Sequence, residues 1–173
     1  MSCVLLNYRA TDYLIHKRHS HPGYLCSNIR LHNFEERRLG FKEALHDHGL
    51  SYSKSIIHEL SPSIDGAYSD FMEVLDQKQE LADCYFADND LIAIGVIKAL
   101  SERGYKVPED VGVIGFDNID TNHIFQPSLS SIAFSRKYLG QLAIHQLLHH
   151  ITNPKQPHIK IAIDTRLVKG AST

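Results

Sequence analysis

The stretch CYFADNDLIAIGVIKALSERGYKVPEDVGVIGF, residues 84–116, decides the fold class. CYFAD and VGVIGF have the length of strands, and the second is apolar throughout, a pattern typical of strands covered on both faces in a parallel sheet. LIAIGVIKALSERG, between them, is too long for a typical strand and ends at Gly104, which favours a buried helix that Asp88 or Asn89 can cap. Strand, helix and parallel strand in this order predict a βαβ unit.

The same alternation continues on both sides of this unit. Asn33 is predicted to cap the helix after GYLCS, with Glu36 completing a capping box and Gly49 ending the helix. We therefore expect an α/β fold with three αβα layers and a mostly parallel sheet. Further helices are expected at 5–18, around 68–75 and around 138–151, and further strands at 23–27, 55–60, 130–134 and, as one or two strands, 159–168.

Composition narrows the class of protein. The chain has 173 residues and a net charge of −2, so it lacks the basic excess of a domain that holds DNA by neutralising phosphates. Its three cysteines are widely spaced without a CxxC pair, which favours buried thiols in a reducing compartment. No apolar run approaches the roughly 20 residues that span a membrane, and the N-terminus is a poor signal peptide. We therefore expect a cytoplasmic protein without membrane contact.

Polar residues gather where predicted strands lead into helices, which in an open parallel sheet is the edge that binds ligands. Carboxylates, amides and guanidinium groups together suit a polyol or another small polar ligand. The alternative is structural, since Asn89 and Asp117 can simply cap helices and the arginines can be solvated surface residues. The candidates are Asp88, Asn89, Asp90, Asp117, Asn118, Asp120, Arg37 and Arg38.

Catalytic, cofactor and metal motifs are not found in the sequence. Twelve histidines include the pair His145 and His149, four residues apart on a predicted helix, but no HExxH or zinc-finger spacing occurs. The patterns GxxxxGK[ST], GxGxxG and GxSxG are also missing. We therefore expect no metal site, no cofactor and no enzymatic activity, and interpret the histidines as a polar helix face.

Several segments, in the order found here, resemble the LacI family of transcriptional regulators. The similarity extends over roughly residues 10–173. The most specific part is 84–118, because it combines strand, capped helix, glycine stop, PED turn and second strand. The other matching segments are ERRLGFKEAL (36–45), QPSLSSIAF (126–134), RKYLGQLAIHQLL (136–148) and RLVKGAST (166–173).

The resemblance implies a two-lobed effector-binding core like that of periplasmic sugar-binding proteins, preceded by a helix-turn-helix and a hinge. This chain has no room for the DNA-binding part and is expected to lack most of the first lobe, so that its periplasmic-binding-protein-like lobe structure is truncated. The implied division is a helical remnant of the N-terminal lobe, the C-terminal effector-binding lobe, a segment returning to the N-terminal lobe and closing strands, at 1–20, 21–131, 132–155 and 156–173 respectively.

The resemblance also implies ligand contacts. Arg37 matches an arginine that hydrogen-bonds the effector, and Asp117 matches the acidic residue of the family's "GfD". Asn89 and Asp90 match the polar position after the "ifa" strand. Two further positions depart from the pattern: Phe134 stands where some members place a polar contact, and Ser61 where several carry an aromatic ring that stacks on the ligand. Stacking on a sugar would then require another ring, such as that of Tyr68.

The implied function is binding of a sugar or related polar effector, which closes the lobes and changes how a homodimer fits operator DNA. Contact with DNA would come only through the N-terminal domain missing here, and LIAIGVI or second-lobe helices could supply dimer surface. The main alternative is a periplasmic-type sugar-binding protein of a transporter, which would need an export signal. An enzyme acting on a sugar or nucleotide is a second alternative, but no activated nucleophile is recognisable.

Overall fold

A single sheet organises the computed structural model, which describes residues 3–18 and 20–173. Its strands are β1 (Gly23–Ser27), β2 (Ile57–Leu60), β3 (Cys84–Ala87), β4 (Gly112–Phe116), β5 (Ser130–Phe134) and β6 (Thr165–Val168). They lie in the order β2-β1-β3-β4-β5-β6. All neighbours are parallel except β6, which runs antiparallel to β5. The predicted mostly parallel sheet is confirmed.

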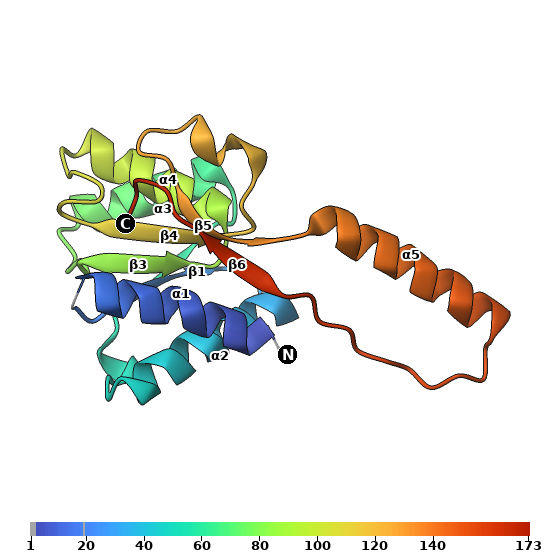
Figure 1. Cartoon of the computed structure of the whole chain (residues 1–173). Coiled ribbons are helices and arrows are strands. Elements are labelled where there is room, and N and C mark those ends of the chain that lie inside the picture. The colour runs from blue at the N-terminus through green and yellow to red at the C-terminus, as the bar shows by residue number, and fades with distance from the viewer. Residues whose placement is uncertain (1–2, 19) are drawn as a thin grey trace.

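Helices cover both faces of this sheet (Figure 1). The α-helices are α1 (Cys3–Arg18), α2 (His32–Asp47), α3 (Ile64–Asp76), α4 (Asp90–Glu102) and α5 (Arg136–Thr152), and the 3-10 helices are Tyr52–Lys54 and Asp120–His123. α1 and α2 lie on one face, and α3 and α4 on the other. The three αβα layers are therefore confirmed.

Two hydrophobic cores result, one under each helical layer, because successive strand residues point to opposite faces. In β1, Tyr24 packs with the α1–α2 core and Leu25 with the α3–α4 core. In β3, Phe86 packs in the α1–α2 core and Tyr85 in the α3–α4 core. Both faces of the central strands are buried, which explains their unbroken apolar sequence.

The apolar stretch 92–97 of helix α4 is buried within this chain. Ile92, Ile94, Val96 and Ile97 are all buried in the core beside α3 and the sheet. The expectation that LIAIGVI supplies apolar surface to a dimer is therefore wrong, because α3 and the strands already cover that surface.

The start of α2 also differs from the prediction. The helix begins at His32, and its N-cap is Leu31, which forms no side-chain cap hydrogen bond. Asn33 is thus inside the first turn and caps nothing, and Glu36 instead accepts a hydrogen bond from Lys160 at 2.8 Å. The predicted end is confirmed, since Gly49 follows the helix with φ +70°, a conformation that glycine adopts without strain.

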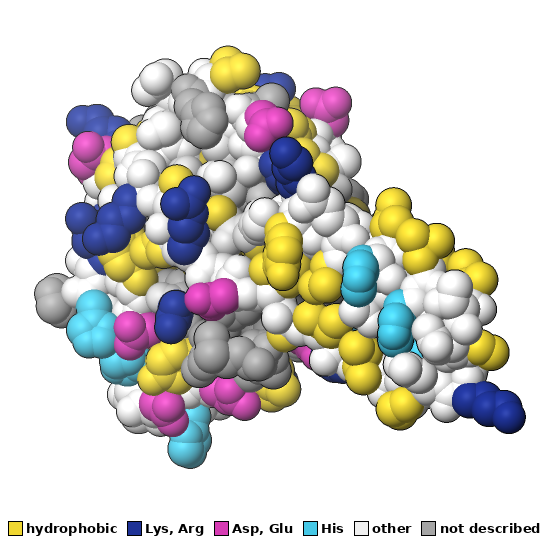
Figure 2. Space-filling view, turned by 45° about the vertical axis from the view of Figure 1, so that its right-hand side comes forward, with side chains coloured by type: hydrophobic (Ala, Val, Ile, Leu, Met, Phe, Trp, Pro, Cys, Tyr) yellow, Lys and Arg dark blue, Asp and Glu magenta, His cyan; other side chains and the backbone are white. Residues whose placement is uncertain are grey.

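Helix α5 stands away from the rest of the molecule, joined to it by β5 and by the chain that returns to β6 (Figure 1). None of its residues is buried. Figure 2 shows hydrophobic side chains over this extension, with histidines among them. The large exposed apolar residues of α5 and of the returning chain are Tyr138, Leu139, Ile144, Leu147, Leu148, Ile151, Ile159 and Ile161. Among residues 3–18 and 20–173, no helix is long and apolar enough to cross a membrane.

Gly95→Ala is expected to lower the free energy of unfolding by about 2 kcal/mol, the usual cost of overpacking a core. A β-carbon at Gly95 would lie 2.5 Å from the carbonyl oxygen of Ile64 and 2.8 Å from the backbone nitrogen of Tyr68. Backbone of α3 cannot move aside as a flexible side chain can. Equilibrium urea unfolding measures the loss.

Gly140→Ala is the matched control, because a β-carbon at Gly140 in α5 meets no atom within 4 Å. The helix preference of alanine then predicts no loss of stability and a gain of at most about 1 kcal/mol. Equal unfolding midpoints for the two variants would show that the α3–α4 contact tolerates a methyl group.

Candidate functional site

The carboxyl edge of the sheet has a switch point between β1 and β3. The chain leaves β1 to form β2 on one side and then crosses to form β3 on the other. Loops diverge at such a point and leave a crevice outside the strand ends. A first cavity of about 500 Å³, counting the open space at its mouth, lies here. Its lining includes Ser27 at the end of β1, Glu59 of β2 and Asp88 directly after β3, together with Phe34 and Arg38 of α2.

Asp88 ties the ends of β1 and β3 together. The Tyr24 hydroxyl donates a hydrogen bond to one carboxylate oxygen, and the Ser27 amide donates to the other at 2.7 Å. Burial raises the pKa of Asp88, although these hydrogen bonds and the nearby arginines oppose the rise. Since both oxygens have protein partners, Asp88 shapes the cavity wall.

Arg37 is buried behind this wall, with only 7% of its surface exposed. Its Nη1 donates to the carbonyl oxygen of Asp88 and its Nη2 to Asp117 Oδ1 at 3.1 Å. The guanidinium group lies 3.7 Å from the ring centroid of Phe116 and 5.3 Å from that of Phe34. The alternative of a solvated surface arginine is therefore wrong.

Asp117 follows β4 and leaves part of its side chain exposed to solvent. Its φ of +104° is strained for a non-glycine residue and turns the carboxylate toward Arg37. Arg136 donates to the Asp117 carbonyl oxygen at 3.0 Å and holds the turn. Burial raises the pKa of Asp117, opposed by the Arg37 and Arg136 guanidinium groups. With 30% of the side chain exposed, Asp117 is more available to a ligand than Arg37.

A second cavity of about 880 Å³, again counting open space, begins beside Asp117. It is lined by Asn118, Asp120 and Arg136, and by Phe134 where the chain leaves β5. The Oδ1 atom of Asn118 is buried without a hydrogen-bond partner in this structure. A buried acceptor of this kind is costly unless a donor reaches it. Arg37 and Asp117 line neither cavity, but Arg37 bonds to Asp88, which lines the first, and Asp117 precedes Asn118, which lines the second.

Asn89 and Asp90 have structural partners. Asn89 Oδ1 accepts from the Ile92 amide at 2.9 Å and caps α4, which confirms capping of this helix by Asn89. Asp90 is fully buried and accepts hydrogen bonds from the Ser131 hydroxyl at 2.6 Å, and from the Ile119 amide and the Asn122 side chain at 2.8 Å. Asp90 is therefore buried against the 119–122 loop and lines neither cavity, and its role as a ligand contact stays a prediction.

Phe134 and Ser61 lie on opposite sides of this edge. Phe134 packs 6.2 Å from Phe116 between ring centroids and lines the second cavity. Ser61, after β2, accepts from Asn28 Nδ2 at 3.3 Å and lines neither cavity. Tyr68, the alternative ring, donates to Glu102 at 2.6 Å and also lines neither. The structure thus brings Arg37, Asp117 and Phe134 together and leaves Ser61 apart.

Sequence reasoning overlooked Tyr24 and Arg136. Tyr24 carries the only side-chain hydroxyl inside the buried part of β1, and Arg136 is the first helical residue after β5. A polar atom inside an otherwise apolar strand, and a cation directly after a strand, were the available signals. Neither feature predicts which residue Tyr24 or Arg136 will bond to, because Asp88 and Asp117 lie far from them in the sequence.

The thiols described in the structure offer no nucleophile. Cys26, at the first cavity, and Cys84 are buried and unpaired, as expected. Burial raises the pKa of each thiol to about 11, so both remain protonated at neutral pH. The side chain of the third cysteine, Cys3, lies outside the described residues.

Comparisons with known proteins agree with this fold. Residues 11–173 match the model of the periplasmic binding protein-like domain. The chain is 32% identical over 164 residues to the HTH-type transcriptional repressor PurR of Haemophilus influenzae, which covers 93% of the chain and 48% of the relative. The chain therefore spans about half the length of the curated relatives it matches.

Solved structures extend the comparison to bound ligands. A LacI family transcriptional regulator from Enterococcus faecium with bound ribose superposes with a TM-score of 0.89 at 30% identity, covering 99% of the chain and 63% of the neighbour. The Escherichia coli transcriptional repressor ascG gives a TM-score of 0.83 at 27% identity, covering 100% and 62%. The chain thus shares its fold with these regulators, one of which was solved with ribose bound.

Proposed function

Since this chain belongs to the family of periplasmic binding protein-like domains, in the form found in LacI-family regulators, we propose that it binds a small polar effector at the carboxyl edge of its sheet. The observation that carries the proposal is the buried Arg37, which joins Asp88 at the first cavity to Asp117 beside the second. A guanidinium group held in this way opposes the rise that burial causes in the pKa of Asp117, and it fixes the direction of the carboxylate.

A sugar or another polyol is the ligand class that this chemistry favours. A carboxylate such as Asp117 accepts hydrogen bonds from two hydroxyls at once, and Asn118, the next residue, lines the second cavity. Arg37 contributes chiefly by positioning Asp117, because its guanidinium group is buried. Phe134 supplies a flanking apolar surface at the second cavity, and Phe116 packs between it and the Arg37 guanidinium group.

Regulation would follow from differential binding to two states of a larger protein. An effector that contacts both lobes favours the closed state and changes the fit of a DNA-binding homodimer to its operator, with reciprocal coupling. The relatives are transcriptional regulators, which favours this function over the transporter alternative. We assign no catalytic step to the site.

Helix α5 is proposed to belong to the other lobe, within the segment 132–155. Its large apolar residues are exposed (Figure 2), and it reaches the edge of the sheet through its first residue, Arg136, which donates to the carbonyl oxygen of Asp117. A solvent-exposed apolar helix of this kind normally packs against another element. The remaining boundaries, at 1–20, 21–131 and 156–173, stay part of the same proposal, and residues 1, 2 and 19 lie outside the described residues.

The test is thermal unfolding of the chain with pentoses, hexoses, sugar phosphates and purines at millimolar concentration. A ligand at a hundred times its dissociation constant stabilises the folded state by about 2.7 kcal/mol and raises the midpoint. We expect a shift with one ligand class that Asp117→Asn reduces strongly. Asp83→Asn is the control, because the Asp83 side chain is exposed and lies directly before β3, at the end of the strand opposite the cavities.

Two outcomes would count against the proposal. If the chain unfolds cooperatively and no ligand of the panel raises its thermal midpoint, the proposal that this chain binds an effector is contradicted. An equal shift in the parent chain and in Asp117→Asn would place the ligand away from the Arg37–Asp117 pair.

A further inference from the structure

We propose that Asp12, His16 and His48 form a binding site for a divalent transition metal of the zinc type. The three side chains meet where α1 packs against α2. Sequence spacing alone predicted no metal site, and this cluster revises that expectation, because His48 joins the other two only through helix packing. The site is separate from the proposed effector site and does not depend on it.

The donor atoms lie close enough together for one metal ion to replace the hydrogen bond between His48 and Asp12. His48 Nε2 lies 2.8 Å from Asp12 Oδ1, and His16 Nδ1 lies 3.3 Å from the same oxygen. One donor atom from each residue lies within 4.8 Å of the others. In tetrahedral zinc, bonds of about 2.0–2.1 Å separate neighbouring donors by roughly 3.3 Å. Small side-chain movements therefore suffice to coordinate an ion.

Local structure places each donor. Asp12 and His16 are four residues apart on α1 and therefore share one face of the helix. His48 is the residue that ends α2, where it points back toward α1. Its ring lies 5.0 Å from that of His16 between centroids, at an interplanar angle of 81°. Two helices thus hold three donors around one point.

The residue types select the class of ion. Imidazole nitrogens favour zinc, nickel, cobalt and copper, whereas magnesium and calcium prefer all-oxygen sites. Exposed fractions of 24% for the His48 side chain, 38% for Asp12 and 66% for His16 leave one side open to solvent. Three protein donors and one water then complete a tetrahedral shell.

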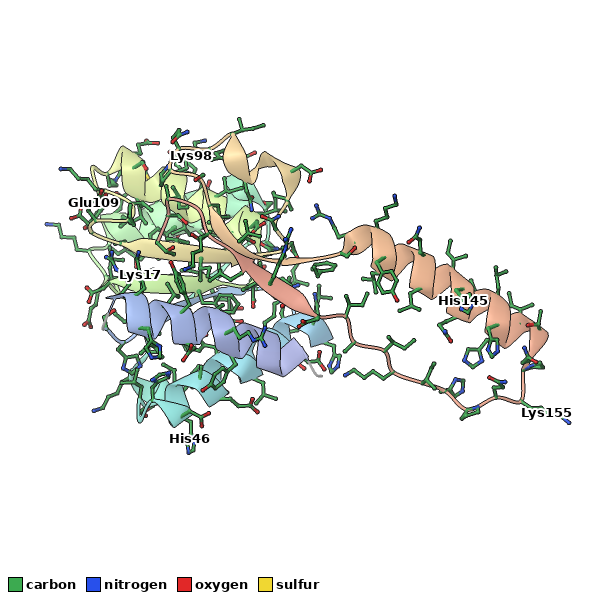
Figure 3. The ribbon with its side chains drawn as sticks, in the orientation of Figure 1. Lys17, His46, Lys98, Glu109, His145 and Lys155 are labelled. Carbon is green, nitrogen blue, oxygen red and sulfur yellow. The ribbon has the colours of Figure 1, made fainter. Side chains whose placement is uncertain are left out.

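The site lies at the end of the molecule opposite the proposed effector cavity. In Figure 3, Lys17 marks the end of α1 and His46 the end of α2, both at the edge away from α5. Arg37 precedes His48 by eleven residues along α2, or roughly 16 Å of helix axis. A bound metal would therefore clamp α1 to α2 without touching the effector site.

The experiment must separate this cluster from a second histidine pair. His145 and His149 also lie one turn apart, on α5, and could bind a metal weakly. The chain, freed of metal, is titrated with ZnCl2 by calorimetry and its thermal midpoint is followed. CoCl2 is then added as a spectroscopic probe, because tetrahedral Co²⁺ has strong visible absorption.

The expected result is a saturable one-to-one Zn²⁺ complex and a rise in midpoint, both retained in His145→Gln/His149→Gln. Zinc binding should weaken at least tenfold in His48→Gln and in Asp12→Asn. His16→Gln provides a variant at an exposed position that should fold normally even where the other two do not. Unchanged zinc affinity in His16→Gln, or binding abolished only by His145→Gln/His149→Gln, would overturn the proposal, as would failure of the parent chain to bind zinc.

Discussion

Replacing Asp90 by alanine is expected to lower the free energy of unfolding by roughly 4 kcal/mol, because several buried donors lose their common acceptor. The Ser131 hydroxyl, the Ile119 amide and the Asn122 side chain all donate to this carboxylate. The loop of residues 119–122 and strand β5 would lose the group that joins them to α4. Urea unfolding at pH 7 measures the loss.

Asp90→Asn is the matched control, because the amide keeps the shape and can still bond all three groups once the Ser131 hydroxyl reverses its role. We expect its stability at pH 7 to lie within about 1 kcal/mol of the parent. If Asp90→Ala were equally mild, the hydrogen bonds of Asp90 would not hold the loop.

The same pair of variants makes a pH prediction. Burial raises the pKa of Asp90 from 3.8 to about 6, so the folded state holds this proton more tightly than the unfolded state. Its stabilising contribution is therefore complete below pH 4 and is lost as the pH rises through about 6. The loss amounts to at most about 3 kcal/mol, at 1.36 kcal/mol per pKa unit.

Asp90→Asn does not titrate, so the parent should lose stability relative to this variant between pH 4 and pH 7. Buried Asp88 and Asp117 also have raised pKa values, and the comparison of parent and variant cancels their contribution. A constant difference in unfolding free energy across this range would contradict the raised pKa.

Arg37→Ala is expected to cost about 3 kcal/mol, because the charged hydrogen bonds and the packing on Phe116 are lost together. The cost stays below that of a fully buried pair, since part of the Asp117 carboxylate is exposed and regains water. Arg37→Lys should recover only part of the stability, because an ammonium group cannot reach both acceptors as a planar fork does. Urea unfolding of both variants checks these values.

Arg103→Ala is the control for Arg37→Ala. Arg103 also pairs with a carboxylate, that of Asp76, but both side chains are exposed to solvent. Exposed pairs contribute at most about 1 kcal/mol, so this variant should be nearly neutral. If both variants lost the same free energy of unfolding, the burial and hydrogen bonds of Arg37 would not stabilise the fold more than an exposed ion pair does.

The local parts of this structure could be predicted because they depend on neighbours in sequence. Gly49 ends α2, and Asn89 caps α4. The capping prediction for Asn33 failed for a related reason: a cap requires a particular backbone path into the helix, and Leu31 occupies that place. The sequence also could not predict that the Asp90 side chain points into the core, since the groups that donate hydrogen bonds to it lie about 30 and 40 residues later.

By itself, the sequence determined the α/β class, the parallel sheet and the positions of most helices and strands, because apolar periodicity repeats within a few residues. Only the tertiary structure decided the strand order, the burial of Arg37 between Asp88 and Asp117, the covering of α4 by α3, and the meeting of Asp12 with His48. Each of these depends on contacts between distant segments. Such contacts form only when the whole chain packs, and a periodic pattern does not record which segments become neighbours.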